Sequence, residues 1–423
     1  MPSSAYKHSS KPSTIHDILQ SSVLPIGAWV APPPDNVVHH NPDYITIDSY
    51  QLAAEAGFTM LYGLYENIEH RFSDVCRAMD CAQAAGIRYL AASTGIAEGL
   101  DVSEVLQRIR ASGEEHPAHL GVLAYDEPAL SQLDTLGALA SSYRENSPDK
   151  LFYVNLLPFC ALSNQIKINK CDESGPPTTP EEYQLYLSEF IEKLQPPLLS
   201  FDNYPCEGAF PHMASHYFLN LSLVTKIARA RSLPVWCFIQ TCAWNNRVRV
   251  PNREEILWQV NTALAYGIKG IQYFTFWQPL ADGTWSGGMV NPDGSLNPQY
   301  TYVKDVNTRI KLSEELFMHG HFEGVVVHGD SPAPIPPTDN LESYGPLVAV
   351  AGEIPVLIGC FSGNGNAGFY AVNNSVTQNG EVMLQFADTV SGIVRWNGTC
   401  RSFTSGFVTI KLEAGDAAYI QLD

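Results

Sequence analysis

The sequence predicts an α/β protein, a (β/α)8 TIM barrel followed by an antiparallel β-sandwich. From Leu24 onward, a short β-rich run followed by an amphipathic helical segment repeats eight times. After about residue 320 the pattern changes to short β-rich runs separated by Gly, Asn and Asp turns. No turn after a strand carries a glycine-rich phosphate loop, as an open dinucleotide-binding sheet would require. Eight units without such a loop favour a closed barrel.

Each predicted strand is a short apolar run that ends in polar or aromatic residues. In chain order the predicted strands are Leu24–Val30, Phe58–Tyr65, Ile87–Ser93, Leu120–Tyr125, Leu151–Leu156, Leu198–Phe201, Val235–Ile239 and Ile268–Trp277. The predicted helices that follow them are Thr46–Ala56, Phe72–Ala85, Val102–Ala111, Leu130–Tyr143, Pro180–Leu194, Phe218–Ala230, Arg253–Tyr266 and Tyr300–Glu315. Gly57, Gly86 and Gly267 directly follow three of these helices, where glycine commonly ends a helix. Thr179 precedes Pro180 as an N-cap.

The chain divides into three predicted segments. Residues 1–22 lack an apolar stretch and are expected to form a flexible leader, and residues 23–320 form the barrel. Residues 321–423 form the β domain, whose predicted strands are Val325–Val327, Leu347–Val350, Val356–Cys360, Gly368–Val372, Val382–Phe386, Thr409–Leu412 and Ala417–Leu422. We expect this domain to pack against the barrel, and a sugar-binding module is the alternative.

Composition restricts the partners. The 423 residues include 25 Lys and Arg against 44 Asp and Glu, a net charge of −19 that repels phosphate backbones and anionic lipid. Nucleic acid and membranes are therefore not expected as partners, whereas neutral sugars fit. Without a C-x-x-C pair or a nucleotide-binding loop, neither a metal nor a cofactor is expected. The absence of a secretory h-region and the nine scattered cysteines favour a cytoplasmic protein, although a secreted parent with a replaced leader stays open.

Candidate site residues gather at the predicted C-terminal strand ends, where TIM-barrel active sites are built. They are Trp29, Tyr65, Glu66, Asp126, Glu127, Asn155, Asp202, Tyr204, Gln240, Trp244 and Trp277. Aromatic rings stack on the apolar faces of sugars, while amides and carboxylates bind hydroxyl groups. This mixture predicts a carbohydrate site.

The run Tyr125-Asp-Glu-Pro128 resembles the Asn-Glu-Pro motif that follows the fourth strand in clan A glycoside hydrolases. The resemblance implies that Glu127 is the general acid/base. Asp126 supports this role, because a neighbouring like charge keeps a proton on an acid. The alternative is a surface helix start, for which Asp-Glu-Pro is also suited. The resemblance also implies that Trp277 is the strand-eight tryptophan under the sugar.

The chain departs from clan A at the nucleophile. Gln240 ends the seventh strand, where that clan has a glutamate, and an amide cannot attack an anomeric carbon. Asp202 at the end of the sixth strand is the first choice for the second carboxylate, as nucleophile or as base toward water. Carboxylates on strands four and six are also the pattern of the α-galactosidase-like clan. Glu66 is the reserve candidate, and retaining and inverting stereochemistry both stay open.

Longer segments strengthen the resemblance. Phe152–Pro158, Leu199–Pro205, Ala263–Gly267 and Ile271–Trp277 look like a poorly characterised group of glycoside hydrolases with a barrel and a small β domain. The similarity covers most of the chain from Leu24. It implies a glycoside hydrolase acting on a carbohydrate substrate. A non-catalytic sugar-binding barrel and a transglycosylase using the same residues are the alternatives.

Overall fold

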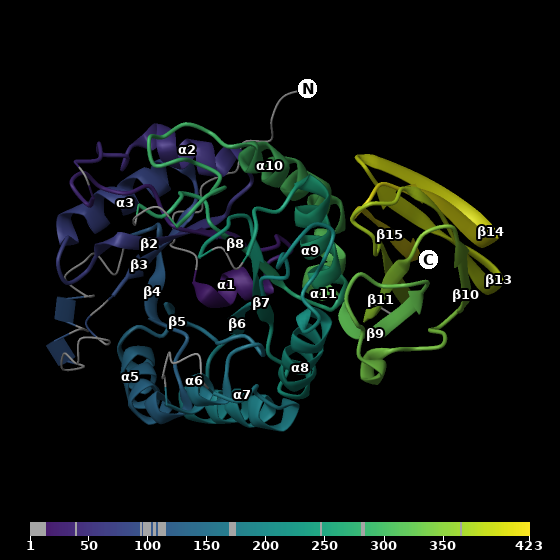
Figure 1. Cartoon of the computed structure of the whole chain (residues 1–423), viewed down its shortest axis with the longest axis horizontal. Helices are drawn as coiled ribbons and strands as arrows, with labels where there is room; N and C mark the ends of the chain where they lie inside the picture. The colour runs from purple at the N-terminus through teal and green to yellow at the C-terminus, as the bar shows by residue number, and fades with distance from the viewer. Residues whose placement is uncertain are drawn as a thin grey trace.

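Eight parallel strands form a barrel (Figure 1). The computed structural model describes residues 14–423 apart from 39, 94, 96–102, 105–106, 109–115, 169–174, 246–247, 281–283 and 364–365. The strands are β1 (Ile26–Trp29), β2 (Met60–Asn67), β3 (Arg88–Ala92), β4 (His119–Asp126), β5 (Leu151–Asn155), β6 (Leu199–Asp202), β7 (Val235–Gln240) and β8 (Gly270–Phe274). They neighbour one another in chain order, and β8 pairs with β1. A parallel bridge between Leu156 and Phe201 joins β5 to β6.

The helices surround the strands. They are α2 (Ile47–Glu55), α3 (Phe72–Ala85), α5 (Leu133–Asn146), α6 (Ser163–Ile168), α7 (Pro180–Leu194), α8 (Tyr217–Ala230), α9 (Arg253–Ala265), α10 (Pro298–Ile310) and α11 (Glu314–His319). Thr179 caps α7 by accepting the Glu182 N–H at 3.2 Å, and Gly86 ends α3 with a φ of 75°. The helix predicted over Val102–Ala111 lies mostly outside the described residues. In the part of the chain that is described, no helix has the length and apolar character to cross a bilayer.

The interior of the barrel has its own apolar cluster, which the N-terminal segment closes from one end. Leu90, Leu120, Leu151 and Trp236 are fully or almost fully buried in this cluster. Ile15 of helix α1 (Ile15–Gln20) joins them and is 2% exposed. The expectation of a flexible leader over 1–22 is therefore wrong for residues 15–20. Figure 1 shows α1, in purple, over the middle of the barrel.

The C-terminal domain is a single antiparallel sheet that encloses one apolar core. Its strands are β9 (His321–His328), β10 (Leu347–Gly352), β11 (Val356–Gly363), β12 (Asn366–Asn373), β13 (Gly380–Trp396), β14 (Thr399–Leu412) and β15 (Ala417–Leu422). The long strand β13 pairs with β10 through its first half and with β15 through its second half. This arrangement brings apolar side chains from all seven strands together. The predicted fold class, a barrel followed by an antiparallel β domain, is confirmed.

Helix α9 joins the two domains. Its residues from Glu255 to Ala265 are all buried, and it packs on β11 and β12. The Trp258 indole N–H donates to Asn374 Oδ1 at 2.8 Å, and the Tyr370 hydroxyl donates to Asn261 Oδ1 at 2.8 Å. These hydrogen bonds lie within an apolar contact that joins the domains, and Figure 1 shows α9 on the side of the barrel toward the β domain.

Candidate functional site

A cavity of about 590 Å³ opens at the C-terminal ends of the strands. This is the rim where TIM-barrel enzymes carry their active sites. The lining residues are Trp29, Tyr62, Leu64, Leu123, Asp126, Glu127, Tyr153, Asn155, Leu157, Pro158, Cys160, Ala161, Gln165, Asp202, Tyr204, Glu207, Phe238, Trp244, Asn245, Val248 and Phe274. Acidic and amide groups come from β4, β5 and β6, whereas the aromatic rings come mainly from β1, β8 and the loops after β6 and β7.

An irregularity in β4 aims its carboxylate into the cavity. Leu123 and Asp126 both line the cavity although simple alternation would place them on opposite faces of the strand. The register between β4 and β5 shifts between Leu123 and Tyr125, and Asp126 then pairs with Asn155. Such a bulge commonly redirects side chains next to active sites. Asp126 and Asn155 therefore face the cavity side by side.

Asn155 lies between the two aspartates. Its Nδ2 amide lies 3.3 Å from Asp126 Oδ1 and 3.2 Å from Asp202 Oδ1, and it donates to both. The side chain of Glu127 is hydrogen bonded to Asp202. Two carboxyl groups can share a hydrogen bond only if one of them carries a proton. Three carboxyl groups, from β4, the turn after it and β6, thus meet in one cavity.

The electrostatics of the aspartates follow from their surroundings. Burial, and after it the nearby charge of Asp126, raise the pKa of Asp202 to about 7, against the hydrogen bonds from Asn155 and Glu127. Asp126 is open to water inside the cavity but enclosed by protein elsewhere. This burial raises the pKa of Asp126, while the hydrogen bond from Asn155 lowers it. Asp202 therefore titrates close to neutrality, as acid–base groups of enzymes commonly do.

Glu127 has a strained backbone. Its φ of 51° lies in the left-handed region, which costs a non-glycine residue roughly 1–3 kcal/mol. The Glu127 N–H donates to the Asn155 carbonyl oxygen at 2.9 Å and so holds this conformation. Pro128 follows directly and ends the strand. The turn keeps Glu127 at the cavity wall beside Asp126.

Aromatic rings form a second wall. Trp29 and Phe274 stack at 5.1 Å with an angle of 6° between their planes. Tyr204 lies 5.2 Å from the Phe274 ring and 5.0 Å from the Trp244 ring. Trp285, from the loop after β8, stacks on Trp244 at 5.9 Å. A continuous aromatic surface thus adjoins the carboxylates, which is the combination that sugars require.

The structure brings most of the predicted site residues together. Those that line the cavity are Glu127, Asp202, Asp126, Trp29, Asn155, Tyr204 and Trp244. Sequence analysis missed Phe238, Phe274 and Glu207, which also line it. Phe274 is the last residue of β8, two residues after Gln272, so both side chains point into the barrel. This spacing could have predicted that Phe274 lines the cavity. Glu207 lies in a loop and had no such signal.

Three predicted substrate-binding residues lie outside the cavity lining. The Tyr65 hydroxyl instead accepts the Leu280 N–H at 2.7 Å and positions the loop after β8. Gln240 is fully buried because its amide binds the main chain of Cys206, Cys242 and Arg249. The structure therefore does not bring Tyr65, Gln240 and Trp277 into the cavity with the other candidates.

Trp277 lies three residues beyond the end of β8 rather than at it. It is 2% exposed and packs on Tyr44, with ring centroids 4.5 Å apart. Its main-chain N–H donates to the Val30 carbonyl oxygen. Trp29 and Phe274 occupy the place in the cavity that was expected for this tryptophan.

Glu66, the reserve catalytic candidate, also lies outside the cavity. The register between β2 and β3 shifts between Tyr62 and Asn67, so Glu66 no longer shares a face with Tyr62. It is fully buried beneath the helices, where the Tyr89 hydroxyl donates to Glu66 Oε1 at 2.5 Å. Burial raises its pKa from 4.5 to about 7. The prediction that Glu66 contributes to the site is wrong.

This buried carboxyl predicts a pH-dependent cost in stability. Below about pH 4.5 Glu66 is protonated in both the folded and the unfolded chain. As pH rises to about 7 the unfolded chain ionises first, so the free energy of unfolding falls by about 3 kcal/mol in total. Glu66→Gln should remove this loss, so the free energy of unfolding of the variant at pH 8 should be higher than that of the wild type. Denaturant unfolding at pH 5 and pH 8 measures the difference.

The exposed Glu381 in β13 provides the control. Glu381→Gln should change the free energy of unfolding equally at both pH values. A difference between Glu66→Gln and the wild type that does not grow with pH would contradict the buried ionisation.

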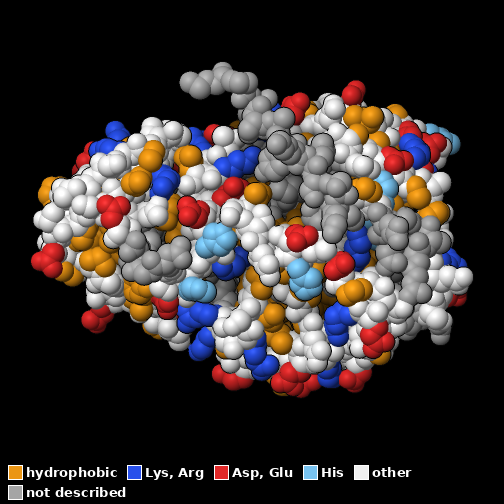
Figure 2. Space-filling model, turned by 180° about the vertical axis from the view of Figure 1, so that it is seen from behind, with side chains coloured by type: hydrophobic (Ala, Val, Ile, Leu, Met, Phe, Trp, Pro, Cys, Tyr) orange, Lys and Arg blue, Asp and Glu red, His pale blue; other side chains and the backbone are white. Residues whose placement is uncertain are grey.

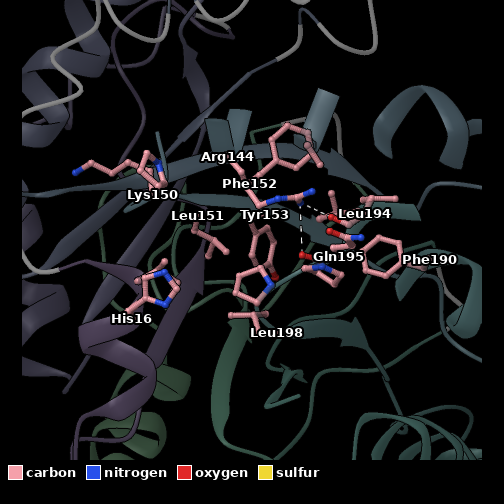
Figure 3. A pocket seen from close by; sticks show the side chains of 16 residues that line it. His16, Arg144, Lys150, Leu151, Phe152, Tyr153, Phe190, Leu194, Gln195 and Leu198 are labelled. Atoms are coloured by element: carbon pink, nitrogen blue, oxygen red, sulfur yellow. Dashed lines mark hydrogen bonds between the residues drawn. The ribbon is translucent and has the colours of Figure 1, made fainter. Parts of the chain in front are cut away.

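A second cavity, of about 250 Å³, lies at the opposite end of the barrel (Figure 3). Its basic groups already have main-chain partners: Arg144 donates to the carbonyl oxygens of Leu194 and Gln195, and Lys150 donates to that of His119 at 2.6 Å. It lies at the N-terminal ends of β5 and β6, the end of a TIM barrel that serves stability rather than catalysis.

The described residues include no group of three or more His, Cys, Asp or Glu side chains arranged to hold a metal ion.

Comparison with known proteins identifies the fold. No family model matches the sequence, and no curated protein matches it. A family 39 glycoside hydrolase from Bacteroides cellulosilyticus WH2 superposes with a TM-score of 0.54 and 14% identity, covering 98% of this chain and 83% of that one. A β-galactosidase from Marinomonas ef1 (TM-score 0.47, 10% identity, 70% of this chain and 62% of that one) and an α-amylase from Anoxybacillus (0.44, 9%, 94% and 97%) also match. The chain therefore has the TIM-barrel fold of glycoside hydrolases.

Proposed function

We propose that this protein hydrolyses a glycosidic bond in the cavity at the C-terminal rim of its barrel. The observation that carries the proposal is the hydrogen-bonded pair of Glu127 and Asp202, which faces an aromatic wall. A proton donor and a second carboxyl group that can act at the anomeric carbon are the two groups that glycoside hydrolysis needs.

The hydrogen bonds to Asp202 indicate which carboxyl group is the proton donor and which is the nucleophile. Those from Asn155 and Glu127 both favour the ionised form of Asp202. Glu127 then carries the proton and donates it to the leaving oxygen, while Asp202 attacks the anomeric carbon. In the second half of the reaction, Glu127 takes a proton from water, which attacks the anomeric carbon and releases the sugar from Asp202.

The proximity of the pair favours retention of configuration. Inverting enzymes separate their carboxyl groups by roughly 6.5–9.5 Å to accommodate water, whereas retaining enzymes hold them roughly 5–5.5 Å apart. Because Glu127 and Asp202 contact each other, we infer the closer, retaining arrangement rather than the inverting one. A covalent glycosyl-enzyme intermediate on Asp202 is the consequence.

The charge of the cavity favours neutral sugars. Four carboxyl groups line it, from Asp126, Glu127, Asp202 and Glu207, and none of the described lining residues is Lys, Arg or His. On the molecular face in Figure 2, basic and acidic side chains of the described residues are interspersed rather than segregated. Uronic acid or sulfated units would therefore meet repulsion at the cleavage site.

A panel of aryl glycosides tests the proposal. We expect turnover of at least one neutral glycoside, and no turnover of the matching glucuronide. Binding of sugars without turnover of any member would instead favour a non-catalytic sugar-binding barrel, which Gln240 in the clan A nucleophile position suggested. Product analysis with an added sugar acceptor distinguishes a transglycosylase, which would form a new glycoside rather than free sugar.

Asp126 is proposed to tune the pair rather than to react. Asp126→Asn removes the charge that raises the pKa of Asp202, so Asp202 should ionise at lower pH. The acidic limb of the kcat/KM profile, near pH 7 in the wild type, should move to lower pH, and kcat at the optimum should stay within about tenfold of the wild type. The pH–rate profile of the variant measures this.

A loss of kcat of roughly 10⁴-fold in Asp126→Asn at every pH would contradict the tuning role. Such a loss would make Asp126 the nucleophile, with Asp202 as its acid, as in the α-galactosidase-like arrangement of strands four and six.

A further inference from the structure

A continuous chain of polar side chains crosses the barrel interior below the cavity. It comprises Tyr62 of β2, Gln272 of β8, Ser200 of β6 and Asn155 of β5, each at most 5% exposed. The interiors of TIM barrels are filled mainly by branched apolar residues. Burying four polar groups is costly unless each is hydrogen bonded, and here all of them are.

The hydrogen bonds of this chain run in one direction. The Tyr62 hydroxyl donates to Gln272 Oε1 at 2.5 Å, and Gln272 Nε2 donates to Ser200 Oγ at 2.8 Å. Ser200 Oγ donates to Asn155 Oδ1 at 3.1 Å. Asn155 Nδ2 then donates to both Asp126 and Asp202. Every donor therefore points toward the carboxylates.

Tyr153 strengthens the same chain from β5. Its hydroxyl lies 2.6 Å from Gln272 Oε1 and 2.6 Å from Ser200 Oγ. With one hydrogen it donates to only one of them at a time, and the bond to Gln272 Oε1 keeps the carboxamide oxygen toward the tyrosines.

We propose that Ser200 and Gln272 are positioning residues, which fix the Asn155 carboxamide so that its N–H groups face Asp126 and Asp202. This inference rests on the proposed function. A flipped Asn155 would turn its oxygen toward two carboxylates and its N–H groups toward Ser200. Ser200 opposes that flip, because Gln272 Nε2 already donates to its oxygen and its one hydrogen needs an acceptor.

The orientation of Asn155 affects the pKa of both aspartates. An amide that donates to Asp202 and Asp126 stabilises their ionised forms, and an amide free to turn does so less. Hydrogen bonds in a chain also polarise one another, so the bond at Asn155 is strengthened by those behind it. The proton affinity of the reactive pair is thus set partly from the centre of the barrel.

Other titratable groups surround this pair, and of these only Tyr153 on β5 contacts the mutated side chains. The others are Glu127 directly after β4, Tyr183 and Tyr186 on α7, Tyr204 and Glu207 in the loop after β6, and Cys237 on β7. A shift seen on cutting the chain therefore reports the orientation of Asn155.

The test is Ser200→Ala, with the carboxyl titration of the folded protein followed by infrared difference spectroscopy. Assignment uses the bands that Asp202→Asn and Asp126→Asn remove. We expect the titration of the pair to move up by about one pH unit, which corresponds to one charge-assisted hydrogen bond. The acidic limb of kcat/KM should move up with it, and Ser200→Thr, which keeps the hydroxyl, should restore both.

Gln272→Met breaks the same chain of hydrogen bonds with a side chain of similar volume, and it serves if Ser200→Ala folds poorly. Ser222→Ala removes a serine that is equally buried, in α8 and outside the chain, and should shift nothing. An unchanged carboxyl titration in the folded chain-cutting variants would overturn the positioning role. The infrared titration needs no turnover. A wild type without activity would therefore refute the proposed function, whereas the infrared shift alone decides whether Ser200 and Gln272 position Asn155.

Discussion

Asp202→Asn is expected to lower kcat by about 10⁴-fold or more on every glycoside that the wild type cleaves, because an amide cannot form the covalent intermediate. Asp202 is 6% exposed and bonded to Asn155, and asparagine has nearly the same shape, so the fold should be kept. Steady-state kinetics measure the loss, and thermal unfolding checks the fold. Asp388→Asn, at an exposed position of β13, is the matched control and should retain full activity.

Azide distinguishes a nucleophile from an acid in the same position. With Asp202→Ala, azide should enter the vacated space and form a glycosyl azide whose anomeric configuration is opposite to that of the substrate. A product with the configuration of the substrate would contradict the role of Asp202 as nucleophile.

Glu127→Gln has the second largest expected effect. Glycosides with poor leaving groups should lose about 10²–10⁴-fold in kcat, because no proton reaches the leaving oxygen. Activated aryl glycosides depart without protonation, so the formation of the intermediate should be slowed far less. A series of aryl glycosides with leaving groups of graded acidity measures this dependence.

The second step supplies a further criterion for Glu127. Azide needs no general base, so it should accelerate Glu127→Gln on activated substrates and give a glycosyl azide with the configuration of the substrate. Glu145→Gln, on the exposed surface of α5, should behave as the wild type in all of these assays. Equal losses on good and poor leaving groups would exclude Glu127 as the acid.

The fold was predictable because its signals are periodic and local. Helix α7 begins and ends where the sequence placed it, since Thr179 and Pro180 define its start and the apolar face its length. The strand-end rule then brought Asp126, Asn155 and Asp202 together, because parallel strands present their C-terminal ends at one rim.

The errors at Glu66 and Trp277 come from where strands shift register or end. The register shift in β2 turned Glu66 away from the cavity, whereas the shift in β4 turned Asp126 into it. Each strand contains a glycine, Gly63 in β2 and Gly121 in β4, which is common at bulges, but a glycine does not tell where the register shifts. Trp277 was predicted to end the eighth strand, but β8 ends at Phe274, three residues earlier.

The polar layer inside the barrel also escaped prediction. Gln272 and Ser200 occur singly within apolar strands, where one polar residue carries little signal. Their roles emerge only when β5, β6 and β8 close around them, because each needs a partner from another strand.

The most direct test of the account is to trap the intermediate. The protein is incubated with an activated 2-deoxy-2-fluoro analogue of the best glycoside from the panel, and the labelled peptide is identified by mass spectrometry. The expected result is one fluoroglycosyl group per chain, attached to Asp202. Attachment to Asp126, or to any residue outside the cavity, would contradict it.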